Sequence, residues 1–170
     1  MKVLHDNGDV VATYADDSAV LVDHSGLPHL IMPDDVVLET GDDGTHKLPT
    51  GIEAWRKIGR ATVNLWKQRR QDGGFMFNGV LFQSDKLSRQ NILAARMRAR
   101  EAMTFGEALV IPWTAADNTE HPLDAATLVA FSDAAYEHHV GAHLAAIEVK
   151  REIDDARTIP EIEDLLQRLA

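Results

Sequence analysis

The chain has 170 residues, of which 45% are hydrophobic, and a formal net charge of −10 at pH 7. This composition predicts one folded domain, or two small modules that share a core, and argues against wholesale disorder. The absence of cysteine excludes a disulfide scaffold, a thiolate zinc site and a cysteine nucleophile, and no run reaches the roughly 20 apolar residues of a membrane helix.

Residues 1–50 have the pattern of short strands separated by turns. Apolar runs at 10–14, 19–22, 30–32 and 36–38 alternate with turn-forming sequences rich in Gly, Pro, Asn and Asp. Pro28, Pro33 and the acidic pair at 34–35 favour edge strands or loops for the last two runs. A segment so interrupted buries little core of its own. We therefore expect it to dock on another part of this chain, or on another chain, as an attachment segment.

Residues 51–74 predict a basic amphipathic helix. Its apolar positions recur at helical spacing, at Trp55, Ile58, Thr62, Leu65 and Trp66. Arginine and lysine occupy the other faces, and Gly73-Gly74 ends the helix. Because both tryptophans lie on the face expected to be buried, core packing is favoured over stacking on nucleic-acid bases.

Asn78-Gly79 between two apolar runs predicts a two-residue hairpin with φ > 0 at both central residues. The register places four side chains on one face, namely Phe75, Phe77, Val80 and Phe82, and leaves Met76 and Leu81 on the other. Since both faces are apolar, we expect both to be covered by helices or by another subunit. Burial of Phe77 predicts that Phe77→Ala lowers the free energy of unfolding by about 3–5 kcal/mol.

Two further helices and a second hairpin are predicted after residue 82, before a short final helix. Ser88 is the expected cap of a helix that runs to about Met103, with Leu87 packing on Ile92 as a hydrophobic staple. Residues 109–113 and 119–122 form the strands of the second hairpin. Thr158–Glu161 is a capping box that opens the final amphipathic helix.

A long helix over 125–156, capped by Asp124, carries two apolar stripes. The first comprises Leu128, Phe131, Ala135, Ala142, Ala146, Val149 and Ile153, and the second comprises Val129, Tyr136, Val140, Leu144 and Ile147. A small domain cannot easily cover both stripes and both hairpin faces, so we expect self-association. The predicted assembly and packing residues are Phe75, Phe77, Val80, Phe82, Trp113, Tyr136, Val140, Leu144 and Ile147.

These elements predict an α+β fold, with an N-terminal arm of short strands followed by a mainly helical module with two small β-hairpins. Along the sequence we divide the chain into a β-rich attachment segment (1–50), a basic amphipathic helix (51–74) and a helical module with hairpins (75–170).

Charge is unevenly distributed along the chain. Residues 1–50 carry a net charge of −8, residues 51–100 carry +8 and residues 101–170 carry −10. This pattern indicates that acidic parts fold against the basic part, within one chain or between copies. The alternative is a nucleic-acid-binding accessory protein that uses the basic helices at 56–70 and 86–100, although an acidic protein is a poor generic binder of nucleic acid.

His139 and His143 are the candidate metal ligands, because positions i and i+4 share a helix face. The H-E-x-x-H pattern of zinc peptidases is incomplete here, since Val140 replaces the general-base glutamate. Packing or hydrogen bonding of these histidines is therefore favoured over a metal-dependent enzyme. The chain has no phosphate-binding loop and no nucleophile elbow, and its acidic pairs lack the spacing of a calcium loop. We expect no catalytic residue and no cofactor.

Residues 79–167 resemble a domain of unknown function found in tailed bacteriophages, where it typically forms part of tail-fibre, tail-tip and related tail proteins. The matching features are the 79–85 segment before a helix with Ser88, then Trp113-Thr114 with Asp117-Asn118, Leu123-Asp124, Ala142-His143-Leu144, and the closing residues 158–162. The resemblance implies no catalytic residues.

The expected function is therefore that of a non-enzymatic structural or adaptor component of a phage tail, at the tail tip, the baseplate or a fibre. We expect a homo-oligomer, most simply a trimer, that also contacts other tail proteins, with no membrane partner. Residues 1–6 show no apolar signal core, so we expect synthesis in the host cytoplasm and a final location in the virion.

Overall fold

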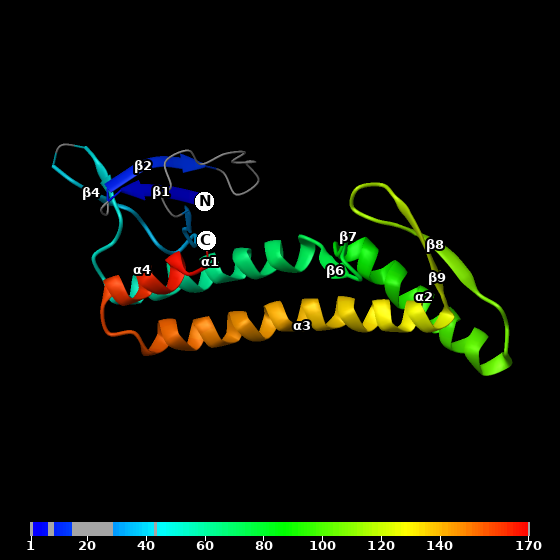
Figure 1. Cartoon of the computed structure of the whole chain (residues 1–170). Coiled ribbons are helices and arrows are strands. Elements are labelled where there is room, and N and C mark those ends of the chain that lie inside the picture. The colour runs from blue at the N-terminus through cyan, green and yellow to red at the C-terminus, as the bar shows by residue number, and fades with distance from the viewer. Residues whose placement is uncertain (1, 7–8, 15–28, 43, 170) are drawn as a thin grey trace. The chain divides into compact units, whose positions relative to one another are not determined.

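The structure is a computed structural model that describes residues 2–6, 9–14, 29–42 and 44–169. In these residues, four helices are combined with small antiparallel strand pairs, which confirms the predicted α+β class (Figure 1). The chain forms two compact units. Met1–Trp66 and Ala146–Ala170 make the first unit, and Lys67–Ala145 makes the second. This grouping reflects compactness in space and does not test the three segments predicted along the sequence.

The first unit contains a five-stranded antiparallel sheet. Its strands are β1 (Lys2–Asp6), β2 (Asp9–Tyr14), β3 (His29–Ile31), β4 (Glu39–Thr40) and β5 (His46–Lys47), in the order β3-β1-β2-β5-β4. The expected runs at 10–14 and 30–32 coincide with β2 and β3, whereas the run at 19–22 lies outside the described residues. The run at 36–38 is a loop, because a turn closes at this point through a 3.1 Å hydrogen bond from the Val36 N–H to the Pro33 carbonyl.

The described end of the attachment segment docks on helices of its own chain. Leu30, Met32, Val36 and Leu48 are buried in one cluster with residues of α1 (Ile52–Asp72), the end of α3 (Ala125–Asp155) and α4 (Ile159–Gln167). Polar contacts fix this docking. The Ile31 N–H donates to Thr62 Oγ1 at 3.0 Å, and the Trp55 indole donates to the Pro49 carbonyl at 2.7 Å.

Close helix approach in the first unit depends on Gly59 of α1. A Cβ at this position would lie 3.1 Å from Ile153 Cδ1 and 3.3 Å from Ile162 Cγ2, and both isoleucines are completely buried. Glycine therefore lets α1 pack directly against α3 and α4 in this unit. The capping box of α4 forms as predicted, because Thr158 accepts from the Glu161 N–H.

The hairpin of the second unit has the predicted register. Strands β6 (Phe75–Phe77) and β7 (Val80–Phe82) pair Phe75 with Phe82 and Phe77 with Val80. The turn residues Asn78 and Gly79 have φ of 50° and 80°, as a type I′ turn requires.

The base of this hairpin is tied to the end of α1 through the buried Ser84. Its hydroxyl donates to the Gln71 carbonyl at 2.6 Å and accepts from the Gly74 N–H at 2.8 Å. The Gln71 carbonyl and the Gly74 N–H lie at the end of α1, where backbone groups lack helical hydrogen-bond partners. The Ser84 side chain therefore satisfies both groups.

Helix α2 (Lys86–Phe105) begins one turn earlier than predicted. The cap is Asp85, whose carboxylate accepts from the backbone N–H groups of Leu87 and Ser88 and from the Ser88 hydroxyl. The predicted Ser88 cap and Leu87 staple are therefore wrong, and Leu87 is exposed. Asp85, and not Ser88, caps the helix because a carboxylate accepts several hydrogen bonds at a helix N-terminus. The helix ends at Phe105, two residues beyond the expected Met103, and Gly106 follows in the left-handed conformation.

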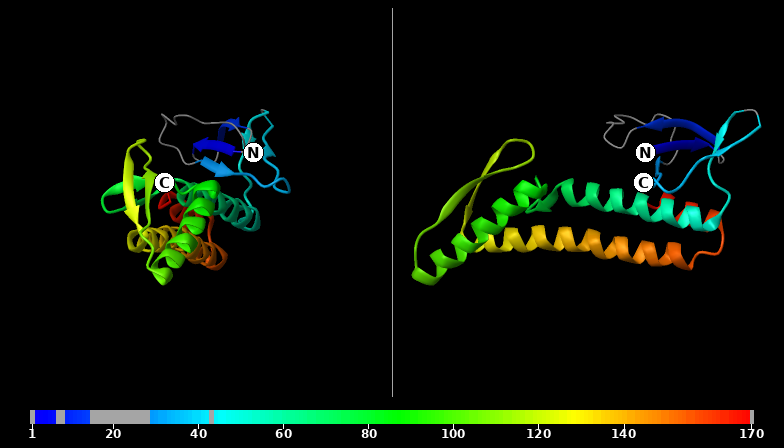
Figure 2. Two further views of the ribbon diagram at one scale, coloured as in Figure 1. Left: turned by 90° about the vertical axis from the view of Figure 1, so that its right-hand side faces the viewer. Right: turned by 180° about the vertical axis from the view of Figure 1, so that it is seen from behind.

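Strands β8 (Val110–Thr114) and β9 (Glu120–Asp124) form the second predicted hairpin, which connects the end of α2 to the start of α3 (Figure 2). The Thr127 N–H donates to Asp124, the predicted cap of α3. The first predicted stripe of α3 is confirmed as the core-facing one, since six of its members are buried and Val149 packs on the core. Within the described residues, no helix is both long and apolar enough to cross a membrane.

Candidate assembly surface

Five of the predicted assembly residues pack inside the second unit. The Phe131 ring of α3 is at the centre of their cluster, with ring centroids 4.8–5.4 Å from those of four aromatic neighbours, Phe75, Phe77, Phe82 and Trp113. Val80 packs against the same cluster. Phe75 and Phe82 are buried, but Phe77 is only half-buried, which corrects the expectation that all three are covered. This hairpin face is therefore occupied by the chain itself.

The second predicted stripe of α3 is at the surface only in part, because Val129 packs against the core of the second unit. Tyr136 and Leu144 are 66% and 54% exposed, and Val140 between them is half-buried. Ile147 is also half-buried, but it belongs to the part of α3 that lies in the first unit.

Helix α2 exposes an apolar pair that the sequence reasoning missed. Leu93 and Met97 are 58% and 62% exposed, whereas Ile92, Ala95, Ala99 and Ala102 of the same helix are buried. The spacing of the two residues in the sequence indicates this surface. Leu93 and Met97, at positions i and i+4, share a helix face that points away from the face of Ile92 and Ala99.

The two apolar groups lie on neighbouring helices of the second unit. Arg96 of α2 forms an ion pair with Asp133 of α3 and so fixes these two helix edges beside each other. At the end of α1, Asp72 pairs with Arg89 of α2, and the adjacent Gln71 bonds to His139 of α3. Arg89 therefore lies near His139 and Arg96 near Asp133, so α2 runs antiparallel to α3, and the turn before Arg96 lies level with the turn after Asp133. Leu93 and Tyr136 occupy these two turns. We call the surface formed by Leu93, Met97, Tyr136, Val140 and Leu144 the α2–α3 flank.

The two edges of the α2–α3 flank carry opposite charge. Helix α2 has five basic side chains and one acidic, whereas residues 125–145 of α3 have two acidic side chains and no lysine or arginine. Lys86 and Arg100 share the α2 face of Leu93 and Met97, at positions i−7 and i+7 from Leu93. Glu137 precedes Val140 by one turn on α3. Lys86, Arg100 and Glu137 form no ion pair with any side chain in the described part of the chain.

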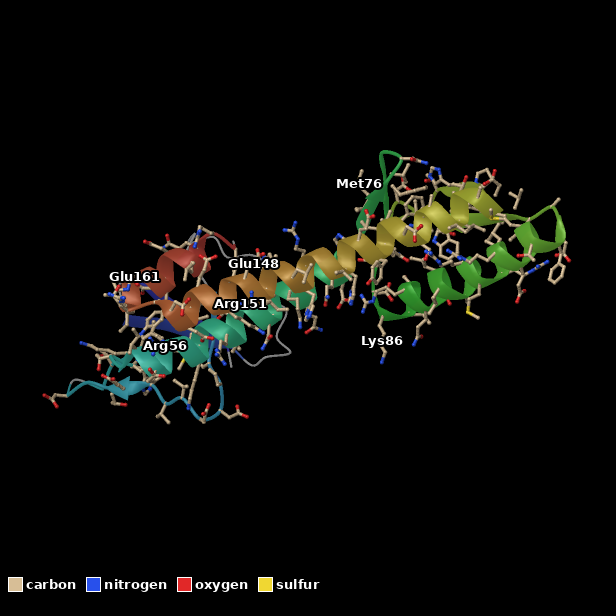
Figure 3. All side chains as sticks on the ribbon, turned by 90° about the horizontal axis from the view of Figure 1, so that it is seen from below. Arg56, Met76, Lys86, Glu148, Arg151 and Glu161 are labelled. Carbon is tan, nitrogen blue, oxygen red and sulfur yellow. The ribbon has the colours of Figure 1, made fainter. Side chains whose placement is uncertain are left out.

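A second, smaller apolar face is formed by Met76 and Leu81 of the first hairpin, which are 60% and 45% exposed. Figure 3 shows Met76 and Lys86 on opposite sides of α3 in the view from below. The expectation that both hairpin faces are covered is therefore met on one face only within the described residues.

Many basic side chains of the 51–100 region contact acidic groups of this chain. Lys57 pairs with Asp35 from the N-terminal region, and Arg60 and Arg96 pair with acidic residues of α3. The Arg60 guanidinium holds the pKa of the Asp154 carboxyl below its ordinary value, first through a hydrogen bond and then through its charge. Much of the charge asymmetry along the sequence is thus compensated by folding.

His139 and His143 occupy one helix face, as predicted, but their surroundings differ. His143 is exposed, while His139 is half-buried against α1, where Gln71 Nε2 donates to its carbonyl at 3.0 Å and lies 3.3 Å from its Nε2. Its buried Nδ1 has no hydrogen-bond partner in the described residues. Those residues contain no group of three side chains of the His, Cys, Asp or Glu type that could hold a metal ion.

Burial lowers the pKa of His139, and the nearby Arg89 guanidinium lowers it further against a smaller opposing effect of Asp72. The folded chain thus binds a proton at this ring less readily than the unfolded chain, whose histidines titrate near 6.5. We expect the stability that His139 contributes to be complete above pH 6.5 and to be lost as the pH falls below it. Urea unfolding at pH 8, 7 and 6 should show this decline, and His139→Gln should reduce it.

The matched control is His143→Gln, which changes an exposed ring one turn further along α3. An equal decline with pH in the wild-type chain and in His139→Gln would contradict the account of His139.

Two comparisons with known proteins gave no match, and a third gave a family. No curated protein and no solved structure matches the chain. Residues 55–166 match the family model described as a domain of unknown function (DUF4376). The match covers more than half of the chain and begins earlier than the resemblance over 79–167, so it includes most of α1 as well as the second unit.

Proposed function

Because the chain belongs to the DUF4376 family, whose function is unknown, we propose its function from its surface: a non-enzymatic structural or adaptor protein that acts by assembly. The observation that carries this proposal is the α2–α3 flank, where large apolar side chains remain exposed on a unit whose aromatic core is complete. Exposed apolar surface of this kind is typical of interfaces. We propose a homo-oligomer, with a trimer as the simplest closed form.

We further propose that this assembly is part of a bacteriophage tail, at the tip, the baseplate or a fibre, and that the protein contacts other tail proteins there. The support is the resemblance of residues 79–167 to a tail-associated domain. The virion would then be its final location.

Purified particles of a tailed phage that carries this gene test the tail proposal. Mass spectrometry should detect the protein in the particles, or deletion of the gene should remove a tail structure visible by electron microscopy. Its absence from particles whose tails remain complete and infectious after deletion would contradict the tail assignment and leave the assembly proposal standing.

Nucleic-acid binding is the alternative. Lys86 and Arg100 on α2 could reach phosphates, but Lys57, Arg60, Arg89, Arg96 and Arg98 are engaged with acidic side chains of the same chain. Binding to duplex or single-stranded DNA that is tight at low salt and falls steeply with added salt would favour this alternative.

A metal-dependent enzyme at His139 and His143 is the third proposal, and the least supported. It requires a ligand from outside the described residues in addition to the two histidines. Elemental analysis decides it, since one tightly held zinc per chain would favour an enzyme.

A further inference from the structure

We propose that the α2–α3 flank is the surface through which copies of this chain assemble, with the α2 edge of one copy against the α3 edge of the next. This inference rests on the proposed self-association and identifies its contact surface. It places Leu93, Met97, Tyr136, Val140 and Leu144 at the centre of the contact.

The apolar side chains supply the attraction. Tyr136, Met97, Leu93 and Leu144 are each more than half exposed, and they extend across two helices held together by the Arg96–Asp133 pair. Tyrosine combines a large apolar ring with a hydroxyl that can hydrogen-bond at the rim, and methionine adapts to irregular surfaces, so both suit a protein interface.

Charge complementarity identifies the occupant as a second copy. Two copies of a surface that has one basic edge and one acidic edge are complementary when a rotation places the basic edge of one copy against the acidic edge of the other. On this flank, Lys86 and Arg100 provide the basic edge and Glu137 the acidic edge, and none of the three has an ion-pair partner in the described part of its own chain. A ring of identical chains around one axis repeats this contact between every pair of neighbours and closes the assembly.

Several acidic residues of the first unit already have partners in that unit. Asp35, Asp154 and Glu152 contact Lys57, Arg60 and Arg168 within that unit. A second copy, by contrast, brings Glu137 with the apolar residues that adjoin it, so one contact covers both the apolar surface and the charges.

The apolar contribution is tested by two serine variants of the full chain, compared by sedimentation velocity across protein concentrations. Tyr136→Ser should raise the dissociation constant of the oligomer by about tenfold or more, the effect expected when a large interface side chain is truncated. Phe105→Ser is the matched control, because Phe105 is an aromatic residue of the same unit, 74% exposed, at the end of α2 and off the flank. Circular dichroism should show unchanged helix content in both variants.

The charge arrangement is tested by reversal and rescue. The variant Lys86→Glu/Arg100→Glu makes both edges acidic and should weaken association by about tenfold, since like charges then face each other. Adding Glu137→Lys restores opposite charges and should recover most of the loss. Arg69→Glu/Glu120→Lys, which changes exposed charges on α1 and β9, is the control and should leave association unchanged.

The outcomes separate this inference from the proposed function. A wild-type chain that stays monomeric contradicts the self-association on which both depend. An oligomer that the flank variants leave intact, or that the triple charge variant weakens further, overturns the α2–α3 flank as the contact while the assembly function stands.

Discussion

Replacing Phe131 by alanine should lower the free energy of unfolding by about 3–5 kcal/mol, the usual cost of removing a fully buried phenylalanine. The Phe131 side chain has no exposed surface, and its ring contacts four aromatic neighbours from both hairpins. Loss of the Phe131 ring leaves a cavity between α3 and the two hairpins. Urea unfolding followed by circular dichroism measures the change.

The half-buried Phe77 is the matched comparison, because it touches the same ring from the edge of the cluster. Phe77→Ala should cost clearly less than Phe131→Ala, and less than the value expected from the sequence. Equal losses for the two variants would mean that the hairpin face is covered more completely than the structure shows.

Ile153→Ala should lower the free energy of unfolding by about 2–5 kcal/mol. Ile153 is completely buried in the first unit, where two of its side-chain atoms lie 3.1 and 3.3 Å from the position of a Cβ on Gly59. Because the backbone of α1 approaches this side chain so closely, the surrounding helices cannot readily collapse into the space that it leaves. The same urea titration measures the loss.

Ile147 is the control for this prediction, because it is an isoleucine of the same helix and unit but is only half-buried. Ile147→Ala should cost distinctly less. A small loss for Ile153→Ala, below about 1 kcal/mol, would contradict the packing of α1 on α3 in the first unit.

Local signals in the sequence predicted most of the second unit. Asn78-Gly79 determined the hairpin register, Asp124 marked the start of α3, and the spacing of Leu128, Phe131 and Ala135 identified the buried face of that helix. Each of these depends on residues close together in the chain, for which turn chemistry and helical periodicity are sufficient.

Features that depend on distant contacts were harder to predict. The cap of α2 is a local exception, because Asp85 and Ser88 lie three residues apart and are both favourable N-cap residues, so the structure was needed to show that Asp85 accepts the helix N–H groups. Leu93 and Met97 share a helix face, but apolar residues also occur on other faces of α2, so the structure was needed to show which of these faces is covered. The described docking of the N-terminal region on α1 and α4 likewise required the tertiary fold.

The candidate surface was therefore predicted in part. Tyr136, Val140 and Leu144 were identified from their periodicity, whereas Phe75 and Phe82, expected to serve packing or assembly, are buried in the core of the chain. Sequence periodicity finds apolar stripes but does not say which of them another element of the same chain covers. The uneven charge along the sequence predicted that acidic and basic segments meet, but it did not identify the ion pairs. Arg60–Asp154 and Arg96–Asp133 join segments that are far apart in the sequence.

The molecular mass of the wild-type chain in solution tests the central claim, assembly through exposed apolar surface, most directly. Light scattering at micromolar concentration should give three times the chain mass of 18.8 kDa. High salt should weaken the oligomer only in part, because screening acts on the charged edges and leaves the apolar contact in place. A monomer of 18.8 kDa at every concentration and salt would contradict the account.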